Sequence, residues 1–173
     1  MALLTVRLYG DPVLRQVAAP VTEITPAIKR NIADMTETMW HQVGIGLAAP
    51  QVGLSYRILV MDDGKGGAQA LLNPVIERRT GTVREEEGCL SLPGIFAEVE
   101  RARTIRVSAM GVDGQRISFE AGGLTSRVVQ HELDHLDGVL FIDRLPPVTR
   151  DRIKKKIQKE GFPKETGHHA FAL

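Results

Sequence analysis

Apolar and polar positions first repeat with the period of an α-helix. After Thr25 and Pro26, which suit an N-cap and a first helical position, apolar side chains recur every three to four residues as far as the glycines that follow. This spacing predicts an amphipathic helix that buries one face. We expect Met35, Met39 and Trp40 to pack in the core rather than to form a cofactor site.

The middle of the chain changes to the two-residue alternation of β-strands. Residues 57–61 and 70–76 are rich in β-forming side chains, and Pro74 in the second run indicates an edge strand or a break. From residue 99 to residue 119 apolar and polar side chains alternate on both sides of Asp113-Gly114. That dipeptide is typical of a tight turn, so this stretch predicts a β-hairpin.

Two more helices are expected near the end of the chain. Residues 124–136 carry apolar side chains along two stripes, which predicts a buried helix, and Gly138 suits its C-terminal cap. Residues 147–160 form a second helical pattern, with Ile153 and Ile157 on the inward side. The chain as a whole therefore predicts an α+β fold, in which antiparallel or mixed β-sheets pack around a central buried helix and a C-terminal helix follows.

Length and composition fit one globular domain. The chain has 173 residues, of which 43% are hydrophobic and 25% charged. We expect residues 1–173 to form a single domain, with 161–173 as a loosely ordered tail. A net charge of +1 does not indicate DNA binding, and no apolar run approaches the roughly 20 residues that cross a bilayer. With one cysteine, no signal-peptide layout and no membrane partner expected, we predict a cytoplasmic protein.

Within the expected buried helix stands the sequence His-Glu-Leu-Asp-His, residues 131–135. Positions i and i+4 of a helix share one face, so His131 and His135 can offer two ring nitrogens to one metal ion. Glu132 lies about 100° further round the helix, where it can move a proton to or from water. Two core histidines placed by chance are the plain alternative, which the position of the glutamate disfavours.

A catalytic metal site usually has three protein ligands and one open position, so a third ligand is needed. Phe141 stands where one large class of metallopeptidases has a third histidine. Asp143 follows directly after the helix cap, and Glu160 ends a very basic helix. Cys89 remains; alone it would be an ordinary small buried residue, but beside two histidines it completes a Cys-His-His set.

A glycine-rich stretch at residues 44–53 lacks the features of both common nucleotide-binding loops. Its glycines suit a backbone that passes close to another group. Gln51 is its one side chain with strong hydrogen-bonding capacity, and local sequence alone would place it facing water.

Three stretches together resemble the motifs of the peptide deformylase family. They are Gly44-Ile45-Gly46-Leu47-Ala48-Ala49-Pro50-Gln51, Glu87-Gly88-Cys89-Leu90-Ser91 and His131-Glu132-Leu133-Asp134-His135-Leu136-Asp137-Gly138. The resemblance covers about residues 5–150 and includes the opening Asp11-Pro12-Val13-Leu14-Arg15. One departure is Ser126, where the family pattern would have alanine. The resemblance implies a metal-dependent hydrolase that removes the formyl group from the N-terminal formylmethionine of new proteins and releases formate.

The resemblance also implies roles for individual residues. Cys89 and the two histidines would bind one divalent metal ion per chain, and Glu132 would transfer the proton of the attacking water to the leaving amine. The Gln51 side chain and the Leu90 backbone N–H would donate hydrogen bonds to the oxyanion. Ligand type favours zinc, whereas the resemblance points to ferrous iron, Fe(II), with zinc able to occupy the site.

By the same resemblance Gly46 and Gly88 would let an N-formylmethionyl peptide lie beside the chain as an added strand. Ile45 and Leu124 would line the pocket for the methionine side chain, and core packing is an equal alternative for both.

Two other functions also fit the sequence. A zinc endopeptidase could use the same His-Glu-x-x-His sequence with a third ligand other than Cys89. A structural metal could instead hold a domain whose residues 150–159, with six basic side chains and one acidic, bind ribosomal RNA. The simpler interpretation of residues 150–159 is a helix face in contact with solvent. If this segment instead binds RNA, the protein would associate weakly with ribosomes.

Overall fold

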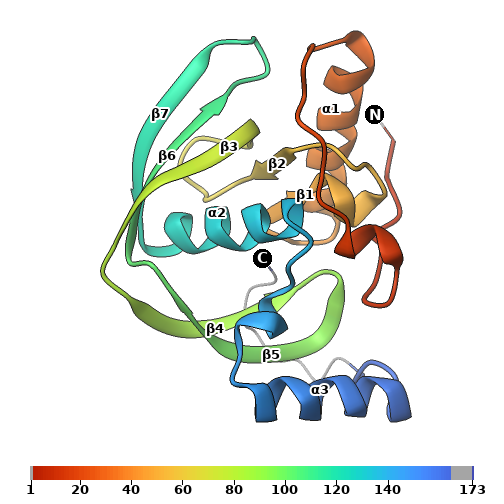
Figure 1. The fold of residues 1–173 in the computed structure, drawn as a ribbon. Helices are drawn as coiled ribbons and strands as arrows, with labels where there is room; N and C mark the ends of the chain where they lie inside the picture. Colours follow the sequence, from red (N-terminus) through yellow and green to blue (C-terminus); the bar gives the residue numbers. More distant parts are fainter. Residues whose placement is uncertain (1, 165–172) are drawn as a thin grey trace.

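The computed structural model describes residues 2–164 and residue 173. It contains three α-helices, seven β-strands and three short 3-10 turns among these residues (Figure 1). In chain order they are η1 (Pro12–Arg15), α1 (Pro26–His41), β1 (Gly46–Ala48), η2 (Ala49–Val52), β2 (Ile58–Met61), β3 (Gln69–Thr80), β4 (Val83–Cys89), β5 (Leu92–Arg101), β6 (Thr104–Met110), β7 (Arg116–Gly122), α2 (Gly123–Leu136), η3 (Phe141–Arg144) and α3 (Pro147–Glu160).

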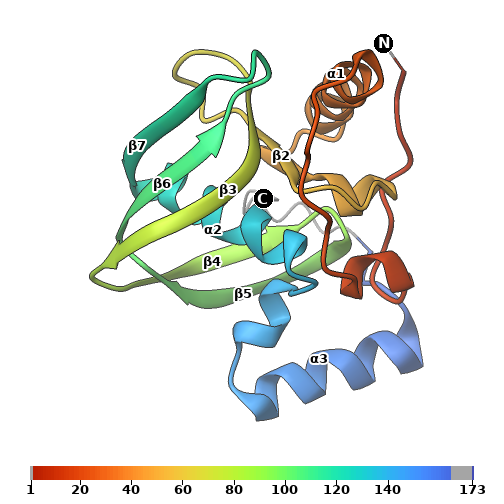
Figure 2. The same ribbon diagram turned by 45° about the horizontal axis from the view of Figure 1, so that its top comes forward.

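The strands form two antiparallel sheets with α2 between them. One sheet has five strands in the order β1-β2-β3-β6-β7, and the other is the β4-β5 ribbon. Figures 1 and 2 show α2 running through the middle of the molecule, with the five-stranded sheet on one side and the ribbon on the other. The predicted α+β fold around a central buried helix, followed by a C-terminal helix, is confirmed.

Helix α1 begins as predicted, because the Thr25 side chain accepts a hydrogen bond from the Ile28 backbone N–H at 3.2 Å. Met35 and Met39 lie one turn apart on its inner face and are fully buried. The prediction that Trp40 packs in the core is wrong: it is 48% exposed, and its indole N–H donates to Asp62. One residue after Met39, its side chain points about 100° away from the buried face.

Pro74 lies where β3 has lost one of its neighbours, because β2 pairs with β3 only as far as Leu72. Both the local edge and the break that Pro74 indicated are therefore observed. Strand β3 pairs with β2 on one side and β6 on the other, and its register against β6 shifts between Leu72 and Val75. The shift at Pro74 accommodates a residue that has no N–H for a regular ladder. Asn73, with a φ of 51°, is held there by two 2.8 Å hydrogen bonds to the Val21 backbone.

Helix α2 is buried along most of its length and ends at Leu136. Gly138 follows the cap with a φ of 74°, and a Cβ there would lie 2.7 Å from the Arg15 backbone oxygen, so glycine is required at this position. Core packing of Leu124 is wrong, because this residue in the first turn is 41% exposed. No helix in the described part of the chain is long and apolar enough to span a bilayer.

Helix α3 has the expected bounds and packs Ile153 and Ile157 against an apolar cluster that includes Cys89 and Phe141. Most of the expected loose tail, residues 165–172, lies outside the described residues. Leu173 is described and is 2% exposed, with its backbone N–H donating to the Gly88 oxygen at 3.1 Å. Strands β1 and β4 were not expected from the sequence, and they carry two of the three motifs.

Candidate metal centre

Cys89, His131 and His135 converge in space. The two histidines project from one face of α2, and Cys89 ends strand β4 beside them. One potential ligand atom from each of the three residues lies within 4.8 Å of the others, and all three residues are buried. Cys89 Sγ is 3.4 Å from His135 Nε2. The structure thus brings together the three metal ligands predicted from the sequence, across more than 40 residues of chain.

Several buried polar atoms at this point have no hydrogen-bond partner among the described residues. They are His131 Nε2, His135 Nδ1 and both carboxylate oxygens of Glu132. An unsatisfied buried polar atom costs about 1–3 kcal/mol, so His131 Nε2 and the Glu132 oxygens need a compensating ligand. His135 Nδ1 lies across its ring from Nε2, the nitrogen that is 3.4 Å from Cys89 Sγ. A sulfur and two imidazoles are a donor set that suits a divalent transition metal or zinc. The residues present therefore fit a metal ion with a water molecule beside it.

The pKa values at the site follow from burial. Burial raises the pKa of the Cys89 thiol well above its usual range, and the nearby Glu132 carboxylate raises it further. A cation is therefore needed to favour the thiolate that ligates metal. Burial, followed by the neighbouring His131, lowers the pKa of His135 well below its ordinary value, so this imidazole is neutral and able to bind a metal.

Glu132 stands beside the three residues and is fully buried. Its pKa is raised well above the ordinary value, first by burial and then by the negative charge of Glu87. A raised pKa makes a carboxylate a stronger base, so it takes up a proton more readily than an ordinary carboxylate, as a general base requires. Strand β1 comes so close to it that a Cβ on Gly46 would lie 2.7 Å from Glu132 Oε1.

The Gln51 side chain lies at the same site and is fully buried, so the water-facing position is excluded. Its oxygen accepts a hydrogen bond from the Ala48 backbone N–H at 2.9 Å. Its amide nitrogen is thereby turned toward Cys89 Sγ at 3.6 Å and Ser91 Oγ at 3.1 Å. The side chain is fixed with an N–H donor directed at the metal-ligand cluster.

Two glycines of the first two motifs lie where another side chain comes close to the backbone, as the glycine-rich sequence predicted. A Cβ on Gly44 would lie 2.9 Å from Leu90 Cδ1, and one on Gly88 would lie 2.4 Å from the Phe96 ring. Leu90 occupies the turn between β4 and β5, and Ile45 is half-buried beside β1. The segments that carry the first two motifs therefore lie beside the two histidines of α2. Leu124 lies apart from them, at the exposed start of that helix.

Glu87 is a residue of the site that sequence reasoning missed. It is fully buried at the end of an acidic run, and its Oε1 is 2.8 Å from His131 Nδ1. Burial alone would raise its pKa, but hydrogen bonds from Arg101 and His131 lower it well below its usual range. The signal that could have found it is its place at the start of the second motif, since the composition of the acidic run does not distinguish its three glutamates.

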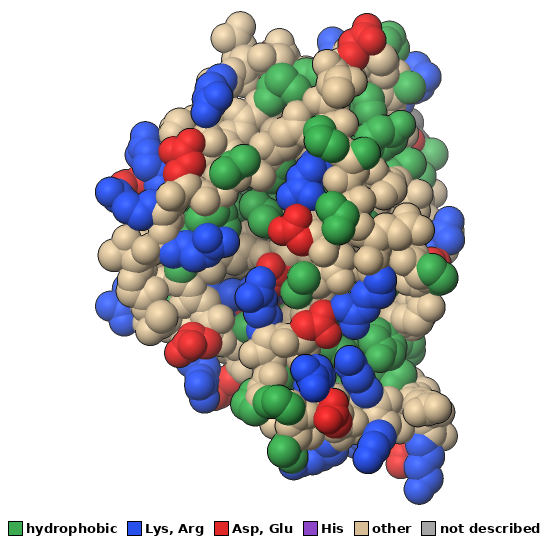
Figure 3. Space-filling model, viewed as in Figure 1, with side chains coloured by type: hydrophobic (Ala, Val, Ile, Leu, Met, Phe, Trp, Pro, Cys, Tyr) green, Lys and Arg blue, Asp and Glu red, His purple; other side chains and the backbone are tan. Residues whose placement is uncertain are grey.

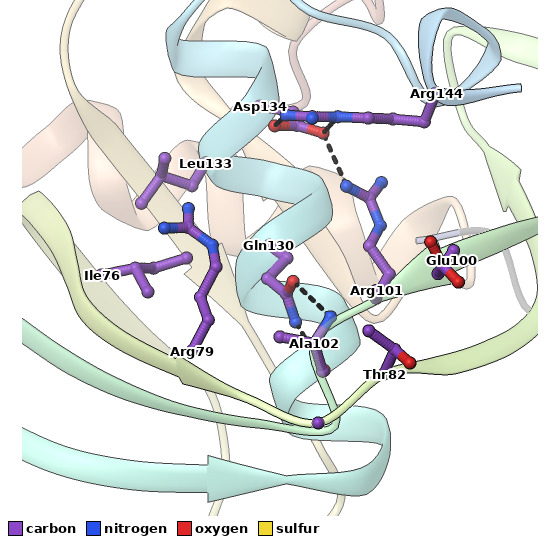
Figure 4. A pocket seen from close by; sticks show the side chains of 11 residues that line it. Ile76, Arg79, Thr82, Glu100, Arg101, Ala102, Gln130, Leu133, Asp134 and Arg144 are labelled. Carbon is purple, nitrogen blue, oxygen red and sulfur yellow. Dashed lines mark hydrogen bonds and ion pairs between the residues drawn. The ribbon is translucent and has the colours of Figure 1, made fainter.

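A cavity of about 300 Å³ opens on another face of α2 (Figure 4). Its walls include Arg79, Gln130, Leu133, Asp134 and Arg144. Asp134, from the third motif, turns toward this cavity and pairs with Arg101 and Arg144. Asp134 therefore does not belong to the cluster of Cys89, His131 and His135. Its carboxylate instead binds the two arginines.

Comparison with known proteins matches residues 3–151 to the family described as polypeptide deformylase. A peptide deformylase of Alkalilimnicola ehrlichii is 48% identical over 162 residues, which are 92% of this chain and 91% of that protein. One of Thermotoga neapolitana is 50% identical over 153 residues, 88% of this chain and 93% of that protein. The crystal structure of the Thermus thermophilus peptide deformylase is 46% identical with a TM-score of 0.86, covering 91% of this chain and 95% of that one.

Proposed function

The chain belongs to the peptide deformylase family, and from this membership and the geometry of the site we propose which residues carry the reaction. The enzyme is a metal-dependent hydrolase that removes the formyl group from the N-terminal formylmethionine of new proteins and releases formate. The assignment of roles depends on one observation above all. Three ligand atoms from Cys89, His131 and His135 lie within 4.8 Å of one another beside a buried glutamate with both oxygens unpaired among the described residues.

Cys89, His131 and His135 hold one divalent metal ion. When bound, such an ion lowers the pKa of a water molecule and polarises the formyl oxygen. By family membership we infer Fe(II) in the active enzyme, with Zn(II) as the alternative that the sulfur and imidazole donors also suit. Metal analysis of protein purified without oxygen, paired with a formate assay, tests this choice: activity that follows zinc content and not iron content would contradict it.

Glu132 is the general base and acid. Its carboxylate removes a proton from the attacking water and returns that proton to the amine of methionine as the carbon–nitrogen bond breaks. Its raised pKa and unpaired oxygens support this role. Glu132→Gln keeps the shape of the side chain and should abolish formate release from formyl-Met-Ala-Ser while the metal stays bound. Turnover that persists in this variant would remove the residue from the mechanism.

Gln51 and Leu90 stabilise the oxyanion that forms when water adds to the formyl carbon. The Gln51 amide donates one hydrogen bond and the Leu90 backbone N–H donates the second. The fixed orientation of the Gln51 amide supports its role, since a donor held in place before the reaction costs no reorganisation during it.

The substrate peptide lies beside Gly46 and Gly88 as an added strand, with its methionine side chain in a pocket lined by Ile45 and Leu124. The Gly88 carbonyl accepts a hydrogen bond from the Leu173 backbone N–H at 3.1 Å, so it can pair with a backbone that is not part of the β4-β5 ribbon. A substrate that uses this carbonyl has to displace that contact. Exposure of Leu124 supports a place at the pocket mouth. Leu124→Ser should raise KM for formyl-Met peptides more than it lowers kcat.

A zinc endopeptidase on the same motif is the competing enzyme function. It requires a third ligand other than Cys89, and it would cleave internal bonds of unformylated peptides. Cys89→Ser separates the two: the deformylase site should lose most of its metal, whereas full retention of metal would favour the peptidase.

Helix α3 offers a basic surface for weak ribosome association through residues 150–159. Figure 3 shows Lys and Arg side chains gathered over α3 at the bottom of the view. A salt-dependent sedimentation assay with ribosomes tests this surface, and absence of binding at low salt would exclude it.

Residues 1–173 act as one catalytic domain in the cytoplasm, where new chains carry formylmethionine. Apolar clusters that connect the sheets and helices support one domain. We expect the protein to unfold cooperatively in a single transition if it is one domain. In a cell fractionation the native protein should appear with the cytoplasmic markers.

A further inference from the structure

The Glu87 carboxylate is saturated with hydrogen bonds. Its Oε1 accepts from His131 Nδ1–H at 2.8 Å and from Arg101 Nη2 at 2.9 Å. Its Oε2 accepts from Arg101 Nε at 2.8 Å and from Arg127 Nη1 at 2.5 Å. All four residues are buried. An ionised carboxylate can only accept, so the His131 nitrogen that faces it has to carry the proton.

Arg127 ties this carboxylate to the surrounding backbone. It stands four residues before His131 on α2, so both side chains leave the same face of the helix. Besides Glu87, its guanidinium donates to the Val99 oxygen at 2.9 Å and the Val83 oxygen at 3.0 Å. The side chain is 3% exposed. A cation buried to this degree is costly unless it is paired, and Glu87 is its nearest counter-ion.

Arg101 holds the same carboxylate from strand β5 and is itself fixed at its far end. Its Nη1 donates to Asp134 at 2.6 Å, and Asp134 also accepts two hydrogen bonds from Arg144, at 3.1 and 2.7 Å (Figure 4). Glu87 therefore sits between two buried arginines from different elements. The carboxylate cannot rotate without breaking several of these bonds, and the His131 imidazole cannot rotate without breaking its bond to Glu87 Oε1.

We propose that Glu87 and Arg127 are positioning residues for the metal site: Arg127 secures the Glu87 carboxylate, and Glu87 fixes the His131 ring with its proton on Nδ1 and its bare Nε2 toward Cys89 and His135. The proposal rests on the metal-binding role given above to His131. The unpaired Nε2 of this histidine among the described residues is the atom that the arrangement leaves for a metal. Outer partners of this kind typically change metal affinity by about 10–100-fold.

The affinity test uses zinc and a fluorescent chelator in competition. Glu87→Gln and Arg127→Met should raise the Kd for Zn(II) by about 10–100-fold. Arg57→Met is the matched control, because Arg57 also anchors α2, through the Leu136 oxygen and Asp137, without touching Glu87. Its Kd should stay within about twofold of the wild-type value. An equal loss in all three variants would overturn the proposal in favour of general loosening of α2.

The second readout is the ring proton of His131, followed by nitrogen-15 NMR of the metal-free protein. The wild type should show the Nδ1–H form alone, and Arg127→Met should show a mixture of both forms. If Arg127→Met does not fold, Arg127→Lys, which keeps the charge with a single donor group, should give an intermediate result. Wild-type ring protonation and wild-type Kd in the folded variants would overturn the proposal.

These outcomes are distinct from failure of the proposed function. If the wild type does not bind one Zn(II) per chain, the metal site itself is wrong, and the positioning roles fall with it. If the wild type binds zinc and the Glu87→Gln and Arg127→Met variants bind it equally well, only the positioning roles are wrong.

Discussion

The Gln51 side chain makes two separate contributions, and two substitutions can separate them. Its oxygen satisfies the buried Ala48 N–H at 2.9 Å, which is a structural task. Its amide nitrogen is directed at the metal-ligand cluster, which is the proposed catalytic task. Gln51→Glu keeps an oxygen for Ala48 and removes the donor, whereas Gln51→Met removes both groups at similar volume.

The expected magnitudes follow from these contacts. Loss of one oxyanion donor raises the barrier by about 3–4 kcal/mol, so both variants should lose about 10²–10³-fold in kcat. KM should change little, because the bond strengthens only in the transition state. Gln51→Met should also lose about 1–3 kcal/mol of unfolding free energy, since it leaves the Ala48 N–H buried and unpaired.

Steady-state formate release from formyl-Met-Ala-Ser gives kcat and KM, and urea unfolding gives the stability of each variant. The zinc content of both variants serves as the control, and it should match that of the wild type. A Gln51→Glu enzyme that folds, binds metal and keeps kcat within about threefold of the wild type would refute the oxyanion role.

Three further substitutions test other parts of the account. Gly46→Ala puts a Cβ 2.7 Å from the Glu132 carboxylate and should lower kcat at least tenfold, in the formate assay, with a stability loss of about 1–3 kcal/mol. Gly138→Ala should lower the free energy of unfolding in urea by about 2–4 kcal/mol. The control Gly161→Ala has the same φ of 74° but open space around it, and should lose only about 1 kcal/mol. Equal losses would exclude a clash between the new Cβ and the Arg15 backbone. Asp143→Asn should cost about 0.5–1.5 kcal/mol near pH 7. Burial would raise the pKa of Asp143, but its arginine partner and a backbone N–H hold that pKa below the unfolded value. The stabilisation by ionised Asp143 is complete above about pH 5 and disappears as pH falls through the lowered pKa. A stability difference between wild type and Asp143→Asn that grows in acid would contradict this reasoning.

Local chemistry made much of the fold predictable. Thr25 and Pro26 mark the start of α1, and the long stripes of α2 indicate a buried helix because capping and periodicity act within a few residues. The meeting of Cys89 with His131 and His135 was also predictable, since a metal pair on one helix requires one more donor and the chain has a single cysteine.

The missed features depend on contacts between distant segments. The second motif begins at Glu87 and leaves out the two glutamates before it, but it gives no contact for this residue, whose inward position depends on Arg101 and Arg127 reaching it across the fold. Trp40 continues an apolar run but lies beyond the edge of the buried face. Short β1 contains too few residues for a periodic pattern.

The central claim is that a sulfur and two ring nitrogens hold one ion and leave a position for water. X-ray absorption at the zinc edge of the loaded enzyme measures this coordination directly. It should give one sulfur at about 2.3 Å and two nitrogens at about 2.0–2.1 Å, with one further light atom that is exchangeable. Cys89→Ser should lose the sulfur shell. A wild-type spectrum without sulfur, or with a fourth protein ligand in the last position, would contradict the account.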